Sequence, residues 1–206
     1  FFMVLPDGVD LKRYKNLPST KEAKSMLGLS PNFTVGYTGH LYPGRGGSFI
    51  LKIAKLSPKT NFLLVGGEPE DVDRLRNESI SLGLNNVSLV GFVHNEKLPY
   101  YQAAADILLM PYQKKVAGSS GGNIAKYLSP MKLFEYLASG RVIISSDLPV
   151  FREILNEKNS LMLDGDKPNV WAKTIQDIRN DEDLRSVLGE NAQKAALQFE
   201  WQKRAQ

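Results

Sequence analysis

Ser129 to Asp147 reads SPMKLFEYLASGRVIISSD and is the most informative stretch of the sequence. Ser129 is a favourable N-cap residue, and Pro130 suits the first helical position because its fixed φ fits the turn and it has no N–H to lose. A helix is therefore predicted to start here. The apolar run over residues 142–145 that follows is typical of a parallel strand buried on both faces.

The same alternation of helix and strand extends along the whole chain. Helical patterns separate further short apolar runs at residues 33–38, 61–65, 87–90, 106–110 and 160–163. This alternation predicts an α/β fold, a doubly wound, Rossmann-like parallel sheet of about six strands with helices on both faces. The length of 206 residues suits a single domain over residues 1–206.

The start of the helix after Ser129 also predicts a site for an anion. The backbone amides of Met131 and Lys132 have no partner within the helix and lie at the positive end of its dipole, with the Lys132 ammonium beside them. Glu135 follows Lys132 by three residues and lies on the same side of the helix. Because a carboxylate repels phosphate but suits sugar hydroxyls, the combination indicates a nucleotide ligand.

A glycine-rich loop, GHLYPGRGG, occupies residues 39–47. It nearly matches two nucleotide-binding patterns and fits neither. Arg45 replaces the phosphate lysine of a P-loop, glycine replaces its hydroxyl residue, and Phe49 replaces the third glycine of the dinucleotide fingerprint. What remains is a strand-to-helix turn with one guanidinium, which by itself suits a phosphate site and an ordinary turn equally well.

Together these segments resemble the C-terminal, donor-binding domain of family 4 retaining glycosyltransferases, one half of a GT-B architecture. The similarity covers almost the full length, and its most specific part is the Ser-Pro-x-Lys-x-x-Glu-Tyr pattern that starts at Ser129. Similar segments also lie at residues 4–14 (VLPDGVDLKRY), 37–47 (YTGHLYPGRGG) and 90–112. The resemblance implies a retaining hexosyltransferase that uses a UDP- or GDP-sugar and an acceptor hydroxyl, in polysaccharide or glycolipid biosynthesis.

The resemblance also implies roles for particular residues. Arg45 and Lys132 are the expected catalytic residues, because they would stabilise the charge that builds on the diphosphate leaving group. Glu135 is expected to bind the ribose, and the backbone at Phe92 and Val93 to contact the base, although Phe92 is alternatively a core residue. The expected donor-binding residues are Gly39, His40, Arg45, Phe92, Val93, Ser129, Pro130, Met131, Lys132 and Glu135.

Two positions depart from the pattern of that family. His40 stands where many relatives have arginine, and Tyr127 stands eight positions before Glu135, where a first glutamate often contacts the transferred sugar. The sugar contact is therefore expected from the loop 118–126 or from Lys132. The long segment 113–128, with GSSGG at its centre, is expected to be a mobile binding loop.

Two other functions fit the same fold. One is a non-catalytic module that binds a nucleotide or sugar phosphate, and the other is a nucleotide-sugar 2-epimerase-like domain, whose catalytic carboxylates are not evident. No metal or other cofactor is expected. Two histidines and no cysteine cannot form a typical zinc site, and Asp164-Gly165-Asp166 suits turn and N-cap chemistry before a helix near Pro168.

The composition of the chain restricts the kinds of partner and the cellular location that we expect. The formal charge of +4, from 26 basic and 22 acidic residues, gives no reason to expect a nucleic acid partner. No apolar run is long enough for a membrane span, no signal-peptide pattern is present, and the absence of cysteine fits a reducing compartment. A cytoplasmic location is therefore expected.

The ends of the sequence suggest half of a larger protein, because it begins at Phe1 and stops within a helical pattern at Gln206. The expected partners are the nucleotide-sugar donor and an acceptor-binding N-terminal domain that is absent from this chain. Peripheral contact with a membrane is expected through that missing half. The chain alone is expected to bind the donor without turnover.

Overall fold

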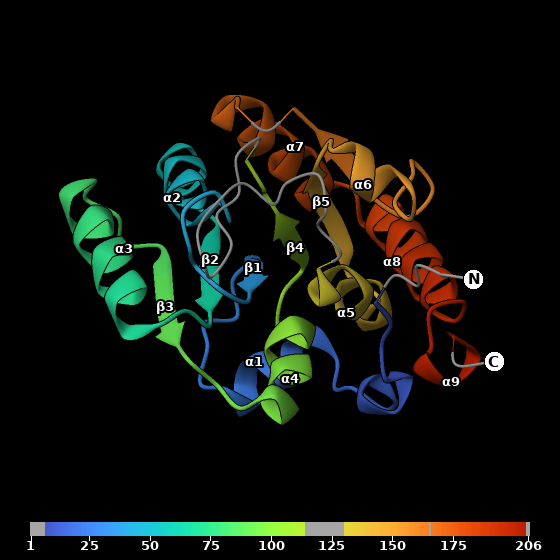
Figure 1. Ribbon diagram of the computed structural model, residues 1–206. Helices are drawn as coiled ribbons and strands as arrows, with labels where there is room; N and C mark the ends of the chain where they lie inside the picture. The colour runs from blue at the N-terminus through green and yellow to red at the C-terminus, as the bar shows by residue number, and fades with distance from the viewer. Residues whose placement is uncertain (1–6, 114–129, 165, 205–206) are drawn as a thin grey trace.

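The computed structural model describes residues 7–113, 130–164 and 166–204. Among them, one sheet contains β1 (Thr34–Thr38), β2 (Asn61–Val65), β3 (Val87–Gly91), β4 (Ile107–Met110), β5 (Val142–Ser146) and β6 (Leu161–Leu163). The strand order is β3-β2-β1-β4-β5-β6, and every neighbouring pair is parallel. This is the order of a doubly wound sheet, so the predicted fold class is confirmed (Figure 1).

Side chains of the central strands alternate between two apolar clusters. In β4, Ile107 and Leu109 belong to one cluster, whereas Leu108 and Met110 belong to the other. All four are completely buried. A strand covered on both faces has a continuous apolar sequence, and this explains why the apolar runs predicted the central strands. The predicted bounds of all six described strands agree with the structure to within one residue at either end.

Helices cover both faces of this sheet (Figure 1). The layer that shares the first cluster contains α2 (Gly47–Leu56), α3 (Pro69–Ser81) and α7 (Pro168–Asn180). The opposite layer contains α1 (Thr20–Met26), α4 (Leu98–Ala103), α5 (Met131–Ser139), α6 (Pro149–Arg152) and α8 (Glu182–Ala196). Shorter elements are η1 (Leu11–Tyr14), η2 (Asn95–Lys97) and α9 (Trp201–Arg204). Each helix in the described ranges is too short or too polar to cross a membrane.

The helix predicted after Ser129 is α5, and it begins one residue later than expected. Pro130 has an extended backbone, with φ −76° and ψ 121°, and is the N-cap residue, so Met131 is the first helical residue. Ser129 itself lies outside the described residues. The amide of Leu133 donates to the carbonyl of Pro130 at 2.9 Å. The amides of Met131 and Lys132 precede it and have no acceptor within the helix.

The entry and exit segments of the described chain lie side by side, with both ends at one edge of the molecule (Figure 1). Val9 and Glu200 form an isolated parallel bridge. The amide of Val9 donates to the carbonyl of Phe199 at 2.9 Å, and the amide of Trp201 donates to the carbonyl of Val9 at 3.2 Å. A Cβ at Gly8 would lie 2.8 Å from the Phe199 oxygen, so only glycine fits without a backbone shift.

Candidate functional site

Several residues singled out in the sequence lie where the order of the strands reverses. β1 and β4 are neighbours in the sheet but not in the chain, and ligands of doubly wound sheets bind beyond the carboxyl ends of the strands at such a point. The amide of Gln113, after β4, donates to the carbonyl of Gly44 at 2.9 Å. Gly46 has φ 100°, and a Cβ there would lie 2.4 Å from the Pro111 oxygen. The glycine-rich loop is therefore packed closely against the chain that follows β4.

Backbone contacts also join the carboxyl ends of β1, β2 and β3. The amide of Gly39 donates to the carbonyl of Val65 at 2.8 Å, and the amide of Gly66 donates to the carbonyl of Gly91 at 2.7 Å. A Cβ at Gly66 would lie 2.6 Å from the Gly39 oxygen. These contacts place the loop after β1 and the loop after β3 on one rim of the sheet.

Lys132 is a buried cation at this rim. It belongs to the first turn of α5 and is only 9% exposed. Its Nζ lies 3.8 Å from the centroid of the Tyr37 ring and 5.4 Å from that of Tyr112, and a Cβ at Gly39 would lie 2.9 Å from it. Within the described residues Nζ has no hydrogen-bond partner. An unpaired ammonium over aromatic rings suits an anionic ligand.

Arg45 brings a second cation to the ring of Tyr112. Its Nη1 donates to the Tyr112 hydroxyl at 3.0 Å, and its guanidinium lies 5.3 Å from the centroid of that ring. Burial lowers the pKa of Lys132 well below its usual range, the Arg45 charge lowers it further, and Glu135 raises it. Arg45 and Lys132 are thus close enough for their charges to repel each other, and an anion would relieve that repulsion.

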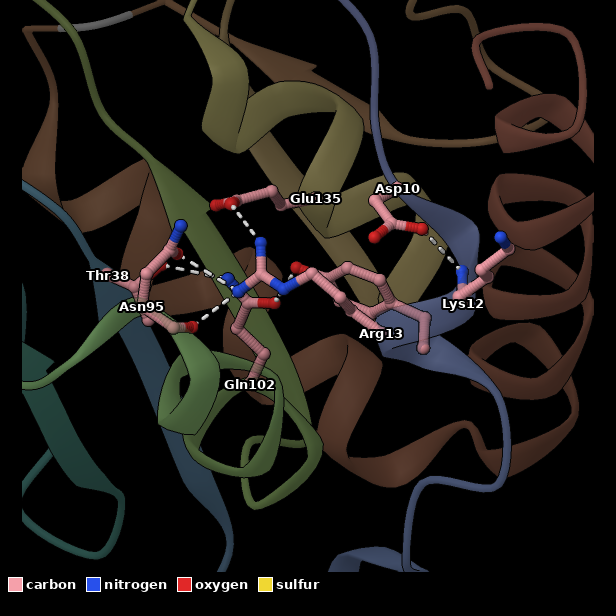
Figure 2. A network of polar contacts seen from close by, with 8 residues as sticks. Asp10, Lys12, Arg13, Thr38, Asn95, Gln102 and Glu135 are labelled. Carbon is pink, nitrogen blue, oxygen red and sulfur yellow. Dashed lines mark hydrogen bonds and ion pairs between the residues drawn. The ribbon is translucent and has the colours of Figure 1, made fainter. Parts of the chain in front are cut away.

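Glu135 lies one turn further along α5, and its side chain is 10% exposed. Nη1 of Arg13, from η1, lies 3.7 Å from its Oε1 (Figure 2). Burial raises the pKa of the Glu135 carboxyl, whereas Arg13, then Lys132 and then a hydrogen bond with Gln102 lower it. The charges of two cations, Arg13 from η1 and Lys132 from α5, therefore act on this carboxyl group.

Buried polar side chains connect the elements around Glu135 (Figure 2). The Tyr14 hydroxyl donates to Oε1 of Gln102 at 3.0 Å, and Nε2 of Gln102 donates to Oγ1 of Thr38 at 3.1 Å. The amide of Thr38 donates to the Tyr136 hydroxyl at 2.8 Å. These bonds link η1, α4, β1 and α5. A buried network of paired groups holds its side chains in defined positions.

Arg13, Gln102 and Tyr112 are candidates that the sequence patterns do not identify. Arg13 lies in the segment 4–14 that resembles the family, but its partner Asn95 is 82 positions away. Tyr112 gives a weak signal, because it is a tyrosine just after a fully apolar strand. Gln102 gives none, since a single amide on a short helix has many structural uses.

His40 and Phe92 lie at the surface rather than among these buried groups. The His40 ring stacks on Tyr42 at 4.9 Å. Phe92 is 76% exposed and meets His94 edge-on at 5.7 Å. The interpretation of Phe92 as a core residue is therefore wrong. Val93, next to it, is half-buried.

Other predictions fall outside the described residues or concern metals. Ser129, Tyr127 and the expected mobile loop, apart from its first residue, are not described, so their roles stay predictions. In the described part of the chain, no group of three or more His, Cys, Asp or Glu side chains could hold a metal ion. The helix expected near Pro168 is α7, which begins at Pro168, and its N-cap residue is Lys167 and not an aspartate.

Comparison with known proteins assigns the family. The sequence matches the family model described as "Glycosyl transferases group 1" over residues 20–195. The chain belongs to this family. The matched range contains every strand of the sheet, the glycine-rich loop and α5. Arg13 and the bridge between entry and exit lie outside it.

Relatives of this group 1 glycosyltransferase chain are longer proteins. D-inositol 3-phosphate glycosyltransferase of Corynebacterium jeikeium is 25% identical over 220 residues, which cover 98% of this chain and 49% of that protein. GDP-mannose-dependent alpha-(1-6)-phosphatidylinositol monomannoside mannosyltransferase of Mycobacterium tuberculosis is 24% identical over 205 residues, covering 96% of this chain and 52% of that protein. The chain spans about half the length of these relatives.

Solved structures share the fold of this group 1 chain. Sucrose-phosphate synthase from Thermosynechococcus elongatus superposes with a TM-score of 0.80 at 24% identity, covering 98% of this chain and 50% of that one. HepE from Anabaena, in complex with UDP-glucose, has a TM-score of 0.78 at 22% identity, covering 96% of this chain and 54% of that one. At this level of identity the likeness establishes the Rossmann-like fold alone.

Proposed function

We propose that this chain is the donor-binding part of a retaining glycosyltransferase that transfers a hexose from a nucleoside diphosphate sugar to an acceptor hydroxyl. The observation that supports this most is the buried ammonium of Lys132, which has no hydrogen-bond partner among the described residues and lies beside the Arg45 guanidinium where the strand order reverses. Burying an ammonium without a partner costs free energy. A diphosphate bound between the two cations would offset that cost.

In this proposal the start of α5 and the glycine-rich loop bind the diphosphate, and the next turn of α5 binds the ribose. Lys132 and Arg45 bind the diphosphate and stabilise the negative charge that develops as it leaves. The amides of Met131 and Lys132, at the positive end of the helix dipole, add to this stabilisation. Glu135, one turn further on, accepts hydrogen bonds from the ribose hydroxyls.

The relatives suggest which donors to test first. HepE was solved with UDP-glucose, and the mycobacterial relative is named as GDP-mannose-dependent. UDP and GDP are therefore the first ligands to test with this chain. We extend the proposal to an N-terminal acceptor-binding domain, because the chain spans about half the length of its relatives. The same proposal includes a site without metal or cofactor and a cytoplasmic location. It also includes membrane contact through the N-terminal domain.

Isothermal titration calorimetry on the chain, with UDP, GDP, uridine and guanosine, tests the assignment. Lys132→Ala is expected to weaken diphosphate binding by about 1.5–3 kcal/mol, the range for charge-assisted hydrogen bonds, and to leave nucleoside binding nearly unchanged. Glu135→Ala is expected to weaken both, because both ligands retain the ribose. Lys55→Ala removes an exposed lysine of α2 and serves as the matched control.

Two results would contradict the assignment. Equal affinities for wild type and a folded Glu135→Ala variant would show that Glu135 does not bind the ribose. Equal losses for the diphosphate and the nucleoside in Lys132→Ala would show that Lys132 does not bind phosphate.

A further inference from the structure

Arg13 contacts both Glu135 and the segment that follows β3 (Figure 2). Its Nη1 lies 3.7 Å from Oε1 of Glu135. Its Nη2 donates to Oδ1 of Asn95 at 3.0 Å and also to the backbone carbonyl of Asn95. One guanidinium, only 25% exposed, therefore joins η1, η2 and α5.

We propose that Arg13 is a positioning residue for Glu135. Arg13 holds the Glu135 carboxylate in place and balances its charge while a phosphate group is bound to Lys132. The inference rests on the proposed function, because it places Arg13 beside the same donor site. It adds a residue from the entry segment, outside the range of the family match.

The charges around the site explain why a second cation is needed. The Lys132 ammonium lies over the Tyr37 ring and has no hydrogen bond to Glu135 or to any other described residue. A diphosphate on Lys132 would neutralise that ammonium and bring negative charge one turn from Glu135. Like charges oppose ionisation of a carboxyl group. Arg13 would then be the cation that keeps Glu135 ionised, and a guanidinium stays charged at any working pH.

The geometry of Arg13 suits this role. Its distance of 3.7 Å from Glu135 is that of an ion pair and is longer than a hydrogen bond. Arg13 therefore takes up none of the carboxylate's lone pairs by hydrogen bonding, and those that Gln102 does not use stay available to ligand hydroxyls. The hydrogen bonds of the guanidinium go to Asn95 instead. Arg13 thus acts as a fixed positive charge whose position is set by the loop and not by the carboxylate.

The other groups around Glu135 offset its negative charge less than Arg13 does. The groups that face it or couple to it are Arg13 and Tyr14 from η1, Lys132 and Tyr136 from α5, and the neutral amide of Gln102 from α4. Burial raises the pKa of both tyrosines, so they are neutral at pH 7. Among the groups that lower the pKa of Glu135, Arg13 has the largest effect. Removing its charge should therefore favour the protonated form of Glu135.

The first test needs no ligand. The pKa of Glu135 is measured from the carbon-13 chemical shift of its carboxyl group as a function of pH. Arg13→Gln is expected to raise this pKa, and Arg13→Lys, which keeps the charge, to raise it less. Lys12→Gln is the matched control, because Lys12 is the neighbouring cation of η1 and points away from Glu135 (Figure 2). An unchanged Glu135 pKa in folded Arg13→Gln overturns the inference and leaves the proposed function intact.

The second test measures binding of UDP and GDP by calorimetry across a pH series. Arg13→Gln is expected to weaken diphosphate binding about tenfold at pH 7 and to move the loss of binding at low pH to higher pH. Lys12→Gln should do neither. In a Glu135→Gln background, Arg13→Gln should cause little further loss, because the two residues act as one unit. Equal losses in both backgrounds overturn the inference. A Glu135→Gln variant that binds like wild type contradicts the proposed function and the inference with it.

Discussion

Lys132 shows how one residue can oppose folding and favour binding. Its ammonium is buried over the Tyr37 ring without a hydrogen-bond partner among the described residues. Unfolding returns this charge to water, so the charge reduces the free energy of unfolding. The same unpaired charge gives an anion a reason to bind. Such residues are a common origin of the trade-off between stability and activity.

Lys132→Met is therefore expected to raise the free energy of unfolding by about 1–3 kcal/mol at pH 7 while it weakens diphosphate binding. The folded-state pKa of Lys132 lies well below 10.5. Between the folded and unfolded pKa values the unfolded chain binds more protons, so the stability of the wild type rises with pH. Urea denaturation of both proteins from about pH 7 to 9.5 should show the advantage of the variant shrinking as pH rises. A constant difference would mean that Lys132 has an ordinary pKa.

The sequence predicts that two charged residues of the site lie close together only when one helix or strand contains both of them. Lys132 and Glu135 are three positions apart on one helix, so their proximity follows from helical geometry, and both are buried on α5. Arg13 meets Glu135 and Asn95 only after three separate elements have packed together. A single charged residue in a short turn has no periodicity that could indicate such a contact. The exposure of Phe92 likewise depends on packing that a local pattern does not contain.

At the scale of elements, the end of α2 depends on a side chain from another part of the chain. Nδ2 of Asn86, just before β3, lies 3.1 Å from the carbonyl oxygen of Ala54, 3.0 Å from that of Ser57 and 2.9 Å from that of Thr60. The last carbonyls of a helix have no partner within it. The carbonyls of Ala54 and Ser57 also accept from the amides of Ser57 and Thr60, so Asn86 adds a side-chain donor that connects the end of α2 to the start of β3.

Asn86→Ala is expected to lower the free energy of unfolding by about 1–3 kcal/mol, because it removes the donor from these partly buried carbonyls. Asn85→Ala is the matched control, since Asn85 is the exposed neighbour in the same turn. Urea denaturation of the two variants measures the difference. Similar losses in both would mean that the amide of Asn86 does not cap the helix.

The existence of the elements was more predictable than their ends. Strands covered on both faces must be apolar throughout, and this requirement appears directly in the sequence of β4. Helix boundaries depend on single backbone angles, and the extended ψ of 121° at Pro130 moves the start of α5 by one residue. The start of α7 was predictable, because a proline at the first helical position marks it, and α7 begins at Pro168 as expected although its N-cap residue, Lys167, makes no side-chain capping bond.

At the scale of the whole molecule, stability should fall from the centre of the sheet to its edge. β4 lies inside the sheet and is completely buried, whereas β3 is an edge strand in which Val90 is 38% exposed. Amide hydrogen exchange is expected to be slowest in β1 and β4 and faster in β3, because edge segments open locally at lower free energy. Nuclear magnetic resonance can measure this amide by amide. Equal protection of β3 and β4 would contradict the expectation and indicate that the sheet opens only as one unit.

The bridge between Val9 and Glu200 also has a mechanical consequence. The two segments run in the same direction, so tension between the ends of the chain pulls them past each other and loads their hydrogen bonds in shear. The two hydrogen bonds, from Val9 to Phe199 and from Trp201 to Val9, then resist this tension at the same time. Unfolding under force depends on the rate at which such contacts rupture and not on the equilibrium free energy. Both bonds must therefore break before tension between the two ends can extend the chain that lies between Val9 and Glu200.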